Sequence, residues 1–158
     1  AFIGREYMKA VHSIPNPTVA LLNNGTEEHK GQELQQQAYK LLKESDIITL
    51  NVALNDETRN LVSAKELALM KNTAIIINAA RGPVVNAKDL ADALKNGTIA
   101  GAALDVYDTE PPLSHDNPLL AAPNTMLLPH IGFATEEAFE LRLGIVVRNV
   151  ERYVSSAF

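Results

Sequence analysis

Residues 73–83, TAIIINAARGP, decide the fold. Residues 74–77 form a continuous apolar run that ends at Asn78, and a turn of small residues with one arginine follows. A run that is apolar on both faces is typical of a central parallel strand covered by helices on each side. Ligands lie beyond the carboxyl ends of the strands in open parallel sheets, so Arg81 stands where a ligand would bind. A surface arginine that merely follows a strand is the alternative that this stretch leaves open.

Length and composition limit the classes of protein that the chain can represent. The 158 residues suit one domain, taken as 1–158. A net charge of −5 with no basic patch argues against a nucleic-acid partner. The absence of cysteine excludes disulfides and thiolate chemistry, and no metal site is expected. No apolar run approaches the ~20 residues of a membrane span, and the N-terminus lacks a signal-peptide layout, so we expect a cytoplasmic protein. The first residue is Ala1 rather than Met, which suggests a fragment or a recombinant chain.

Strand patterns alternate with helix patterns along the chain. This alternation predicts a parallel α/β domain of three layers with right-handed crossovers. Strands are expected over residues 18–22, 47–52, 74–78, 100–106 and 126–128, and helices over residues 4–12, 31–43, 63–70 and 87–95. Thr135 should cap a long last helix, whose apolar positions recur on one helical face: Phe139, Leu143, Val146, Val150 and Tyr153.

Three polar side chains follow three successive predicted strands: Arg81, Glu110 and His130. Parallel strands bring these residues to one edge of the sheet, where they would form a plausible carbonyl site. An arginine can hold a carboxylate through two hydrogen bonds, and a histidine can give or take a proton near neutral pH. Taken singly, each residue also has a structural interpretation, as a strand-end cap or a loop charge. Asp105 could likewise satisfy only backbone donors.

Residues 41–151 resemble the nucleotide-binding domain of D-2-hydroxyacid dehydrogenases. The resemblance rests on LLKESDIITLNVALNDETRNLV, on ELALMKNTAIIINAARGPVVNAKDLADALKNGTIAGAALDVYDTEPP and on NPLLAAPNTMLLPHIGFATEEA. It implies that Arg81 holds the substrate carboxylate, that His130 is the acid/base and that Glu110 orients it. It also implies an NAD site whose residues are Val52, Ala53, Asn78, Ala79, Ala80, Asp105 and Gly132, with Asp105 near the nicotinamide carboxamide. One departure is Asn51-Val52-Ala53-Leu54, where family members often have His-x-Pro-Leu.

The Gly-rich turn that opens such a domain is missing. That G-x-G-x-x-G turn lets the backbone approach the cofactor pyrophosphate at a helix N-terminus. The corresponding loop, residues 23–31, has two glycines six positions apart and carries Glu27 and Glu28, where a phosphate needs positive potential. We therefore expect NAD binding to be weak or absent.

The first 44 residues resemble a segment of bacterial phosphate acyltransferases. The most recognisable part is PTVALLNNGTEEHKG, although His29 stands where that family usually has glycine. Most of that enzyme's site has no counterpart here, so its activity is not carried over. The two resemblances, over residues 1–44 and 45–158, predict an engineered chimera with a junction near residues 39–46.

The grafted segment also predicts a strand order. It supplies helix–strand–helix where the dehydrogenase domain has strand–helix–strand, so one strand is lost. If residues 18–22 take the central position, the order becomes 2-1-3-4-5, which is flavodoxin-like within a Rossmann-like class. A position of residues 18–22 at the sheet edge would contradict this order.

Three functions follow, in order of preference. The first is a chimeric or truncated domain with a vestigial dehydrogenase site and no turnover, because the Gly-rich turn and a substrate domain are missing. The second is a module that weakly binds a nicotinamide nucleotide or a small anion at the strand ends. The third is an NAD-dependent oxidoreductase acting on 2-hydroxy or 2-oxo acids, supported by Arg81, Glu110 and His130. Uncovered apolar surface could also favour a homo-oligomer.

Overall fold

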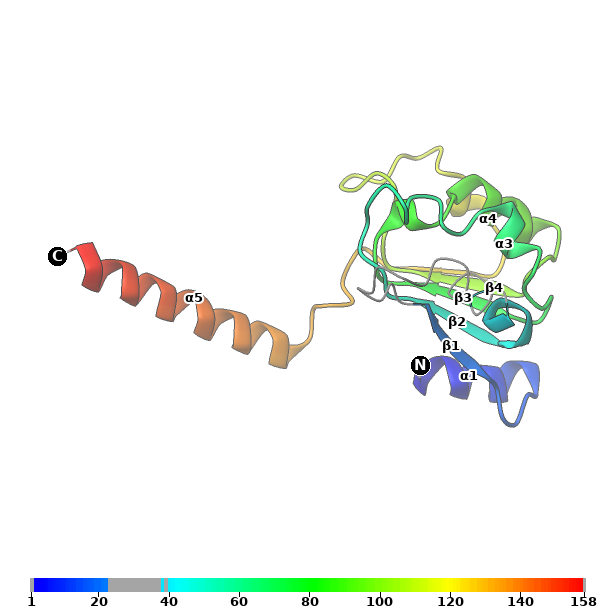
Figure 1. Ribbon diagram of the computed structural model, residues 1–158, viewed down its shortest axis with the longest axis horizontal. Helices are drawn as coiled ribbons and strands as arrows, with labels where there is room; N and C mark the ends of the chain where they lie inside the picture. The colour runs from blue at the N-terminus through cyan, green and yellow to red at the C-terminus, as the bar shows by residue number, and fades with distance from the viewer. Residues whose placement is uncertain (1, 23–37, 39, 158) are drawn as a thin grey trace.

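The computed structural model describes residues 2–22, 38 and 40–157, which form a parallel five-stranded sheet with helices on both faces (Figure 1). Helix α1 covers one face, and α3 and α4 cover the other. The strands are β1 (Val19–Leu22), β2 (Ile47–Leu50), β3 (Ile75–Asn78), β4 (Gly101–Leu104) and β5 (Thr125–Leu127). The helices are α1 (Phe2–His12), α3 (Ala64–Leu67), α4 (Ala87–Lys95) and α5 (Glu136–Ala157), with 3-10 turns over Gly82–Val84 and Pro118–Ala121. The predicted three-layer, Rossmann-like α/β class is confirmed.

The strands lie side by side in chain order, β1-β2-β3-β4-β5, and every neighbouring pair is parallel. The predicted order 2-1-3-4-5 is therefore wrong, because β1 lies at the edge and pairs with β2. Backbone bonds at the start of β2 explain this order. The Asp46 N–H donates to the Thr18 carbonyl on one side (3.0 Å), and the Asp46 carbonyl accepts from the Ile75 N–H on the other (3.0 Å). Strand β2 is thus held between β1 and β3.

Asp46 also joins the starts of β1 and β2 through its side chain. Its carboxylate accepts hydrogen bonds from the N–H and hydroxyl of Thr18, both at 2.8 Å, and from the Lys71 ammonium at 2.8 Å. Burial of Asp46 opposes ionisation, but the bonds from Lys71 and Thr18 prevail and hold the pKa of this carboxyl below its ordinary value of 3.8. This ion pair lies at the amino ends of the strands, whereas the predicted site lies at their carboxyl ends.

The isoleucines of β3 explain why both faces of the sheet are covered. Successive side chains of a strand point to opposite faces. Ile76 is fully buried in the larger core with Leu67 of α3 and Leu90 of α4. Ile75 packs instead in the smaller core with Met8 of α1. The run of residues 74–77 is therefore apolar because each face has its own core.

Capping contacts open two of the predicted helices. Ser63 and Glu66 form a capping box at the start of α3, and the Asn86 side chain accepts from the Asp89 N–H at the start of α4. Gly97 follows α4 with φ 67°, a left-handed conformation that glycine adopts without strain. Of the helix predicted over residues 31–43, only its end lies within the described residues, where residues 40–44 are helical.

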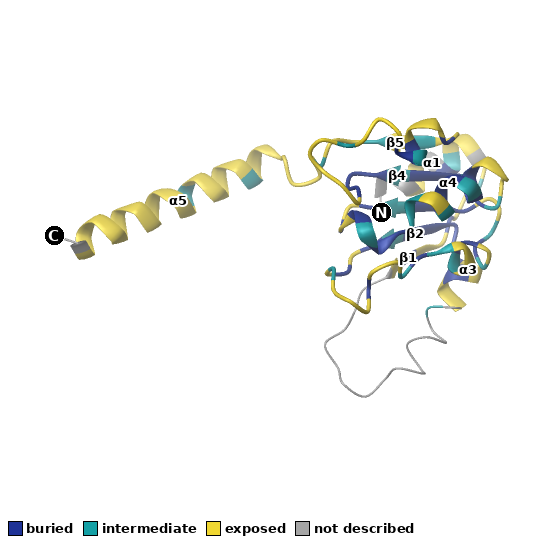
Figure 2. Ribbon diagram, turned by 90° about the horizontal axis from the view of Figure 1, so that it is seen from above, coloured by how far each residue is buried: buried dark blue, intermediate teal, exposed yellow. Residues whose placement is uncertain are grey.

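Helix α5 runs away from the body of the protein, towards the C-terminus (Figure 1). Thr135 caps it as predicted, since its hydroxyl accepts from the Ala138 N–H at 3.2 Å. The predicted apolar face is also present, but it is exposed, as the predominantly yellow helix in Figure 2 shows. Phe139 is 55% exposed and Tyr153 is 74% exposed. Within the described ranges, no helix combines the length and apolar character that a bilayer span requires.

Candidate active site at the carboxyl ends of the strands

The turn after β3 is shaped by the buried side chain of Asn78. Its amide Nδ2 donates to the Arg81 carbonyl (3.0 Å), and its Oδ1 accepts from the Ala80 N–H (3.1 Å). Asn78 is only 1% exposed, so these bonds replace the water that its amide would otherwise bind. Asn78 therefore fixes the turn that presents Arg81 at the sheet edge.

A cavity of about 440 Å³ lies where the turns after β2 and β3 face each other. Arg81 lines it, and its guanidinium donates to the Ala80 carbonyl at 2.6 Å. The other lining residues are small or apolar, apart from one asparagine: Asn51, Val52, Ala53, Leu54, Ala79 and Ala80. Four residues predicted to face the cofactor, Val52, Ala53, Ala79 and Ala80, thus line one cavity with the predicted carboxylate-binding arginine.

Asp105, directly after β4, binds the backbone of the turn that follows His130. One carboxylate oxygen accepts from the Ile131 N–H (2.8 Å), and the other accepts from the Gly132 N–H (2.6 Å). Asp105 is 6% exposed, so the two bonds satisfy a buried charge. Asp105 thus satisfies backbone donors, which is the alternative to a binding role that the sequence leaves open.

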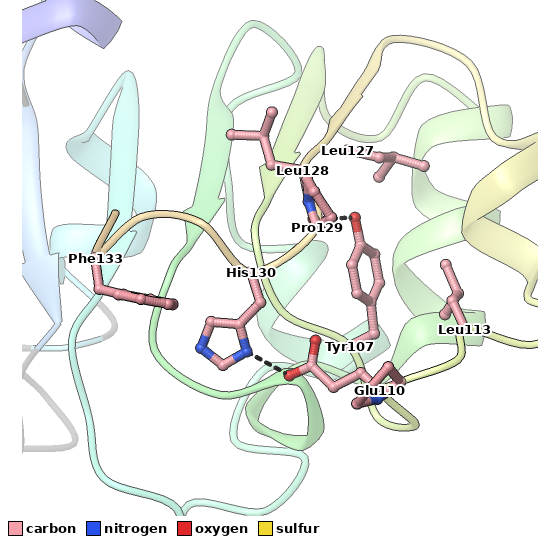
Figure 3. Close-up of a pocket in the computed structure, with 9 residues that line it drawn as sticks. Tyr107, Glu110, Leu113, Leu127, Leu128, Pro129, His130 and Phe133 are labelled. Carbon is pink, nitrogen blue, oxygen red and sulfur yellow. Dashed lines mark hydrogen bonds and ion pairs between the residues drawn. The ribbon is translucent and has the colours of Figure 1, made fainter. Parts of the chain in front are cut away.

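His130 and Glu110 form the most direct contact among the predicted catalytic residues. The distance between His130 Nδ1 and Glu110 Oε1 is 2.9 Å (Figure 3). The two side chains line a largely apolar pocket of about 480 Å³, together with Tyr107, Pro111, Leu113, Leu127, Leu128, Pro129 and Phe133. A carboxylate at Nδ1 selects the tautomer in which Nδ1 carries the proton and leaves Nε2 available to a substrate.

Tyr107 fixes the chain just before His130. Its hydroxyl donates to the Leu128 carbonyl at 2.9 Å, a bond drawn in Figure 3. Burial raises the pKa of the Tyr107 phenol above its ordinary value of 10.0, and the negative charges of Asp105 and Glu110 raise it further, against the opposing effect of the Leu128 bond. The phenol therefore stays protonated near neutral pH and keeps its role as a donor.

Two glycines allow the three turns to lie close together. A Cβ on Gly132 would lie 2.8 Å from Asp105 Oδ2 and 4.0 Å from Ala79 Cβ, so the turn after His130 packs beside the turn after β3. A Cβ on Gly82 would lie 1.8 Å from the carbonyl carbon of Tyr107. The turn carrying Arg81 is thus in backbone contact with the segment that carries Glu110.

The predicted residues are brought to one edge of the sheet in two adjoining groups. His130 and Glu110 contact each other, whereas Arg81 lines the neighbouring cavity. Sequence reasoning missed Tyr107 and Gly82. Tyr107 lies one residue beyond the strand predicted over residues 100–106, so the alternation of that strand does not reach it. Nothing in the sequence marks the backbone contact of Gly82. Among the described residues, no group of three acidic or histidine side chains could hold a metal ion.

The fold defines a Rossmann-like domain that carries a contacting histidine and glutamate at the carboxyl ends of its strands, and comparison with known proteins places it in a family. Residues 2–132 match the model of the D-isomer specific 2-hydroxyacid dehydrogenase, NAD binding domain, family. The chain belongs to this family.

Relatives and solved structures agree with this assignment. The chain is 53% identical over 97 residues to glyoxylate/hydroxypyruvate reductase B of Serratia proteamaculans, a match covering 61% of this chain and 30% of that protein. A D-lactate dehydrogenase structure from Sporolactobacillus sp. has a TM-score of 0.73 at 32% identity, covering 100% of this chain and 51% of that one. A D-isomer specific 2-hydroxyacid dehydrogenase from Xanthobacter autotrophicus Py2, in complex with NADPH and MES, has a TM-score of 0.57 at 41% identity, covering 61% and 31%.

These matches correct the preferred function of the sequence analysis. A vestigial site without turnover was expected, but the relatives, at up to 53% identity, are dehydrogenases and reductases. The comparisons favour the alternative of an NAD-dependent oxidoreductase. The chain spans less than half the length of the curated relatives it matches, with 42% and 30% in two cases.

Two expectations about the N-terminal segment stay predictions. The loop over residues 23–31, on which the expectation of weak NAD binding rests, lies outside the described residues. The acyltransferase resemblance and the chimeric junction near residues 39–46 also stay predictions, and the family match runs across that junction.

Proposed function

We propose that this chain is the catalytic nucleotide-binding part of an NAD-dependent oxidoreductase acting on 2-hydroxy and 2-oxo acids. The observation that carries the proposal is the 2.9 Å contact between His130 Nδ1 and Glu110 Oε1. The side chain of His130 is 40% exposed, so the free Nε2 remains accessible, whereas Glu110 is the less exposed partner at 24%. This is the arrangement of an acid/base histidine held by an orienting carboxylate.

Arg81 supports the choice of a 2-oxo acid. It is the cation of the cavity between the turns after β2 and β3, and a guanidinium matches a carboxylate through two parallel hydrogen bonds. A substrate held there by its carboxylate would place its neighbouring carbonyl towards His130, because the turn after His130 packs beside Ala79. Arg81 then binds and orients the substrate and withdraws electron density from the carbonyl.

The residues present fit the nicotinamide end of NAD. The cavity of about 440 Å³ is lined by small side chains, which let the backbone turns approach a flat ring and its ribose. Val52, Ala53, Ala79 and Ala80 would hold that part of the cofactor. When bound, NADH supplies the hydride that reduces a 2-oxo carbon.

The chain itself would supply the proton that the carbonyl oxygen receives when the substrate is reduced. His130 would donate the proton on Nε2 to the carbonyl oxygen as the carbonyl is reduced, so that the product is the 2-hydroxy acid. In the opposite direction, neutral His130 would accept the hydroxyl proton at the same atom. Glu110 holds the ring through Nδ1 in both directions and stabilises the charged imidazolium.

Steady-state kinetics test the proposal on the full chain. NADH oxidation is followed by absorbance with glyoxylate and with hydroxypyruvate, the substrates named for one relative. We expect turnover that falls by about 100-fold or more in His130→Gln and less steeply in Glu110→Gln, in line with the usual contribution of a general acid. Glu140→Gln, on the exposed helix α5, is the matched control and should keep wild-type rates. Absence of NADH oxidation by the wild-type chain, or full turnover by His130→Gln, would overturn the proposal.

A further inference from the structure

We propose that Asp105 is a positioning residue for His130 and that it acts through the backbone of the turn after the histidine. The inference rests on the proposed role of His130 as the proton donor. It assigns to Asp105 a task other than the cofactor contact that the family resemblance implies. The carboxylate would determine where the imidazole points, without itself touching the reacting atoms.

The contacts of Asp105 are specific to this turn. Its two oxygens accept from two consecutive N–H groups, of Ile131 at 2.8 Å and of Gly132 at 2.6 Å. Hydrogen bonds to an ionised acceptor are short and strong, and a carboxylate that takes two adjacent donors fixes the orientation of the peptide between them. The partners are 26 and 27 residues away in the sequence, so the bonds join the end of β4 to the segment after β5.

His130 needs such support because its backbone is left-handed. Its φ is 57°, a region that residues other than glycine seldom adopt and that persists when the surroundings enforce it. The direction of the imidazole depends on this angle. An extended backbone at His130 would carry its side chain away from Glu110 and would break the 2.9 Å contact between His130 Nδ1 and Glu110 Oε1.

The segment containing Asp105 holds His130 at three points. Tyr107 bonds to the Leu128 carbonyl before the histidine, and Glu110 contacts the ring itself, as Figure 3 shows. Asp105 bonds to the two N–H groups after the histidine. Asp105 is the member that controls the left-handed turn. Gly132 fits this role, because a Cβ at that position would lie 2.8 Å from Asp105 Oδ2.

Asp105→Asn is the informative substitution, since the side chain keeps its shape while one oxygen becomes an NH₂ group that cannot accept. Asp108→Asn is the matched control, because Asp108 lies on the same segment and contacts Asn117 instead. With the full chain, we expect Asp105→Asn to lower kcat about 10- to 100-fold and to leave KM for NADH within about twofold, as expected for a misplaced proton donor. If Asp105 instead contacted the cofactor directly, Asp105→Asn would raise the KM for NADH and leave kcat unchanged.

Nuclear magnetic resonance decides the question even if the chain shows no turnover. In Asp105→Asn, we expect faster amide exchange at Ile131 and Gly132, and a long-range ¹H–¹⁵N spectrum of His130 that changes from one tautomer to a mixture. A purely structural role would lower the melting temperature without changing the ring spectrum. Unchanged exchange together with an unchanged His130 spectrum, or a KM for NADH raised with kcat intact, would overturn the inference. Failure of the proposed function would appear separately, as wild-type inactivity with these spectral changes intact.

Discussion

Substitution of Gly82 by alanine should destabilise the protein more than any other single methyl group added to a described glycine. The added Cβ would lie 1.8 Å from the Tyr107 carbonyl carbon, 2.0 Å from its oxygen and 2.4 Å from the Asp108 nitrogen. All three are backbone atoms, so no side-chain rotation can relieve the overlap. The methyl group would push the turn carrying Arg81 away from the segment carrying Glu110.

The size of the effect follows from these distances. Carbon atoms make favourable contact near 3.5 Å, so one of the two backbones would have to move by roughly 1.7 Å. Overpacking usually costs about 1–3 kcal/mol, and a backbone obstacle belongs at the upper end, so we expect a loss of about 3 kcal/mol. For a chain of this length each kcal/mol lowers the melting temperature by roughly 2–4 °C, which predicts a fall of roughly 6–12 °C.

Thermal and urea unfolding measure this change, with Gly97→Ala as control. Gly97 has φ 67° but nothing within 4 Å of its added Cβ, so alanine there should cost only the left-handed strain of about 1 kcal/mol. We also expect Gly82→Ala to weaken NADH oxidation, because the displaced turn carries Arg81. A Gly82→Ala melting temperature within about 2 °C of wild type, or a loss no larger than that of Gly97→Ala, would refute the argument from backbone contact.

Three further perturbations test separate parts of the structure. Tyr107→Phe removes the donor to the Leu128 carbonyl and should cost about 1 kcal/mol in urea unfolding; no loss would mean that this bond is not made. Asp46→Asn should lower the free energy of unfolding at pH 7 by roughly 1–3 kcal/mol. Because the folded pKa of Asp46 lies below 3.8, its ion pair with Lys71 stabilises the fold above that pH and is lost as the pH falls further, so the difference from wild type should vanish in acid. Removal of α5 should leave the melting temperature within about 2 °C, since this helix is exposed along its length; a large fall would show that it packs on the body.

Some features of the fold and site could be predicted because a local pattern determines them. The buried run before Asn78 required a covered parallel strand, and the strand-end rule then brought Arg81, Glu110 and His130 to one edge. The capping residues Ser63 and Asn86 were equally local, since each bonds within its own helix turn. In each case the side chains that form the strand, the cap or the site are neighbours in the sequence or directly follow parallel strands.

Other features depend on contacts that leave no local pattern. The edge position of β1 is fixed by backbone bonds of Asp46 to Thr18 and to Ile75, and any residue has the same backbone groups. The exposure of α5 could not be predicted because an amphipathic pattern requires no partner to be present. Gly82 and Tyr107 are likewise in contact through their backbones and lie 25 positions apart in the sequence, so no local pattern indicates the contact.

The order of the strands also explains why the glycines missing from one loop say little about the geometry of the His130–Glu110 pair. The loop in question follows β1, which lies at one edge of the sheet, whereas His130 follows β5 at the other edge. The side-chain bonds of Asp105, Tyr107 and Glu110, which hold His130 and its neighbours, come from the segment after β4. We therefore expect a change in residues 23–31 to leave the position of the imidazole unchanged. Variants in residues 23–31 should alter affinity for NADH, whereas variants in the segment after β4 should alter the chemical step.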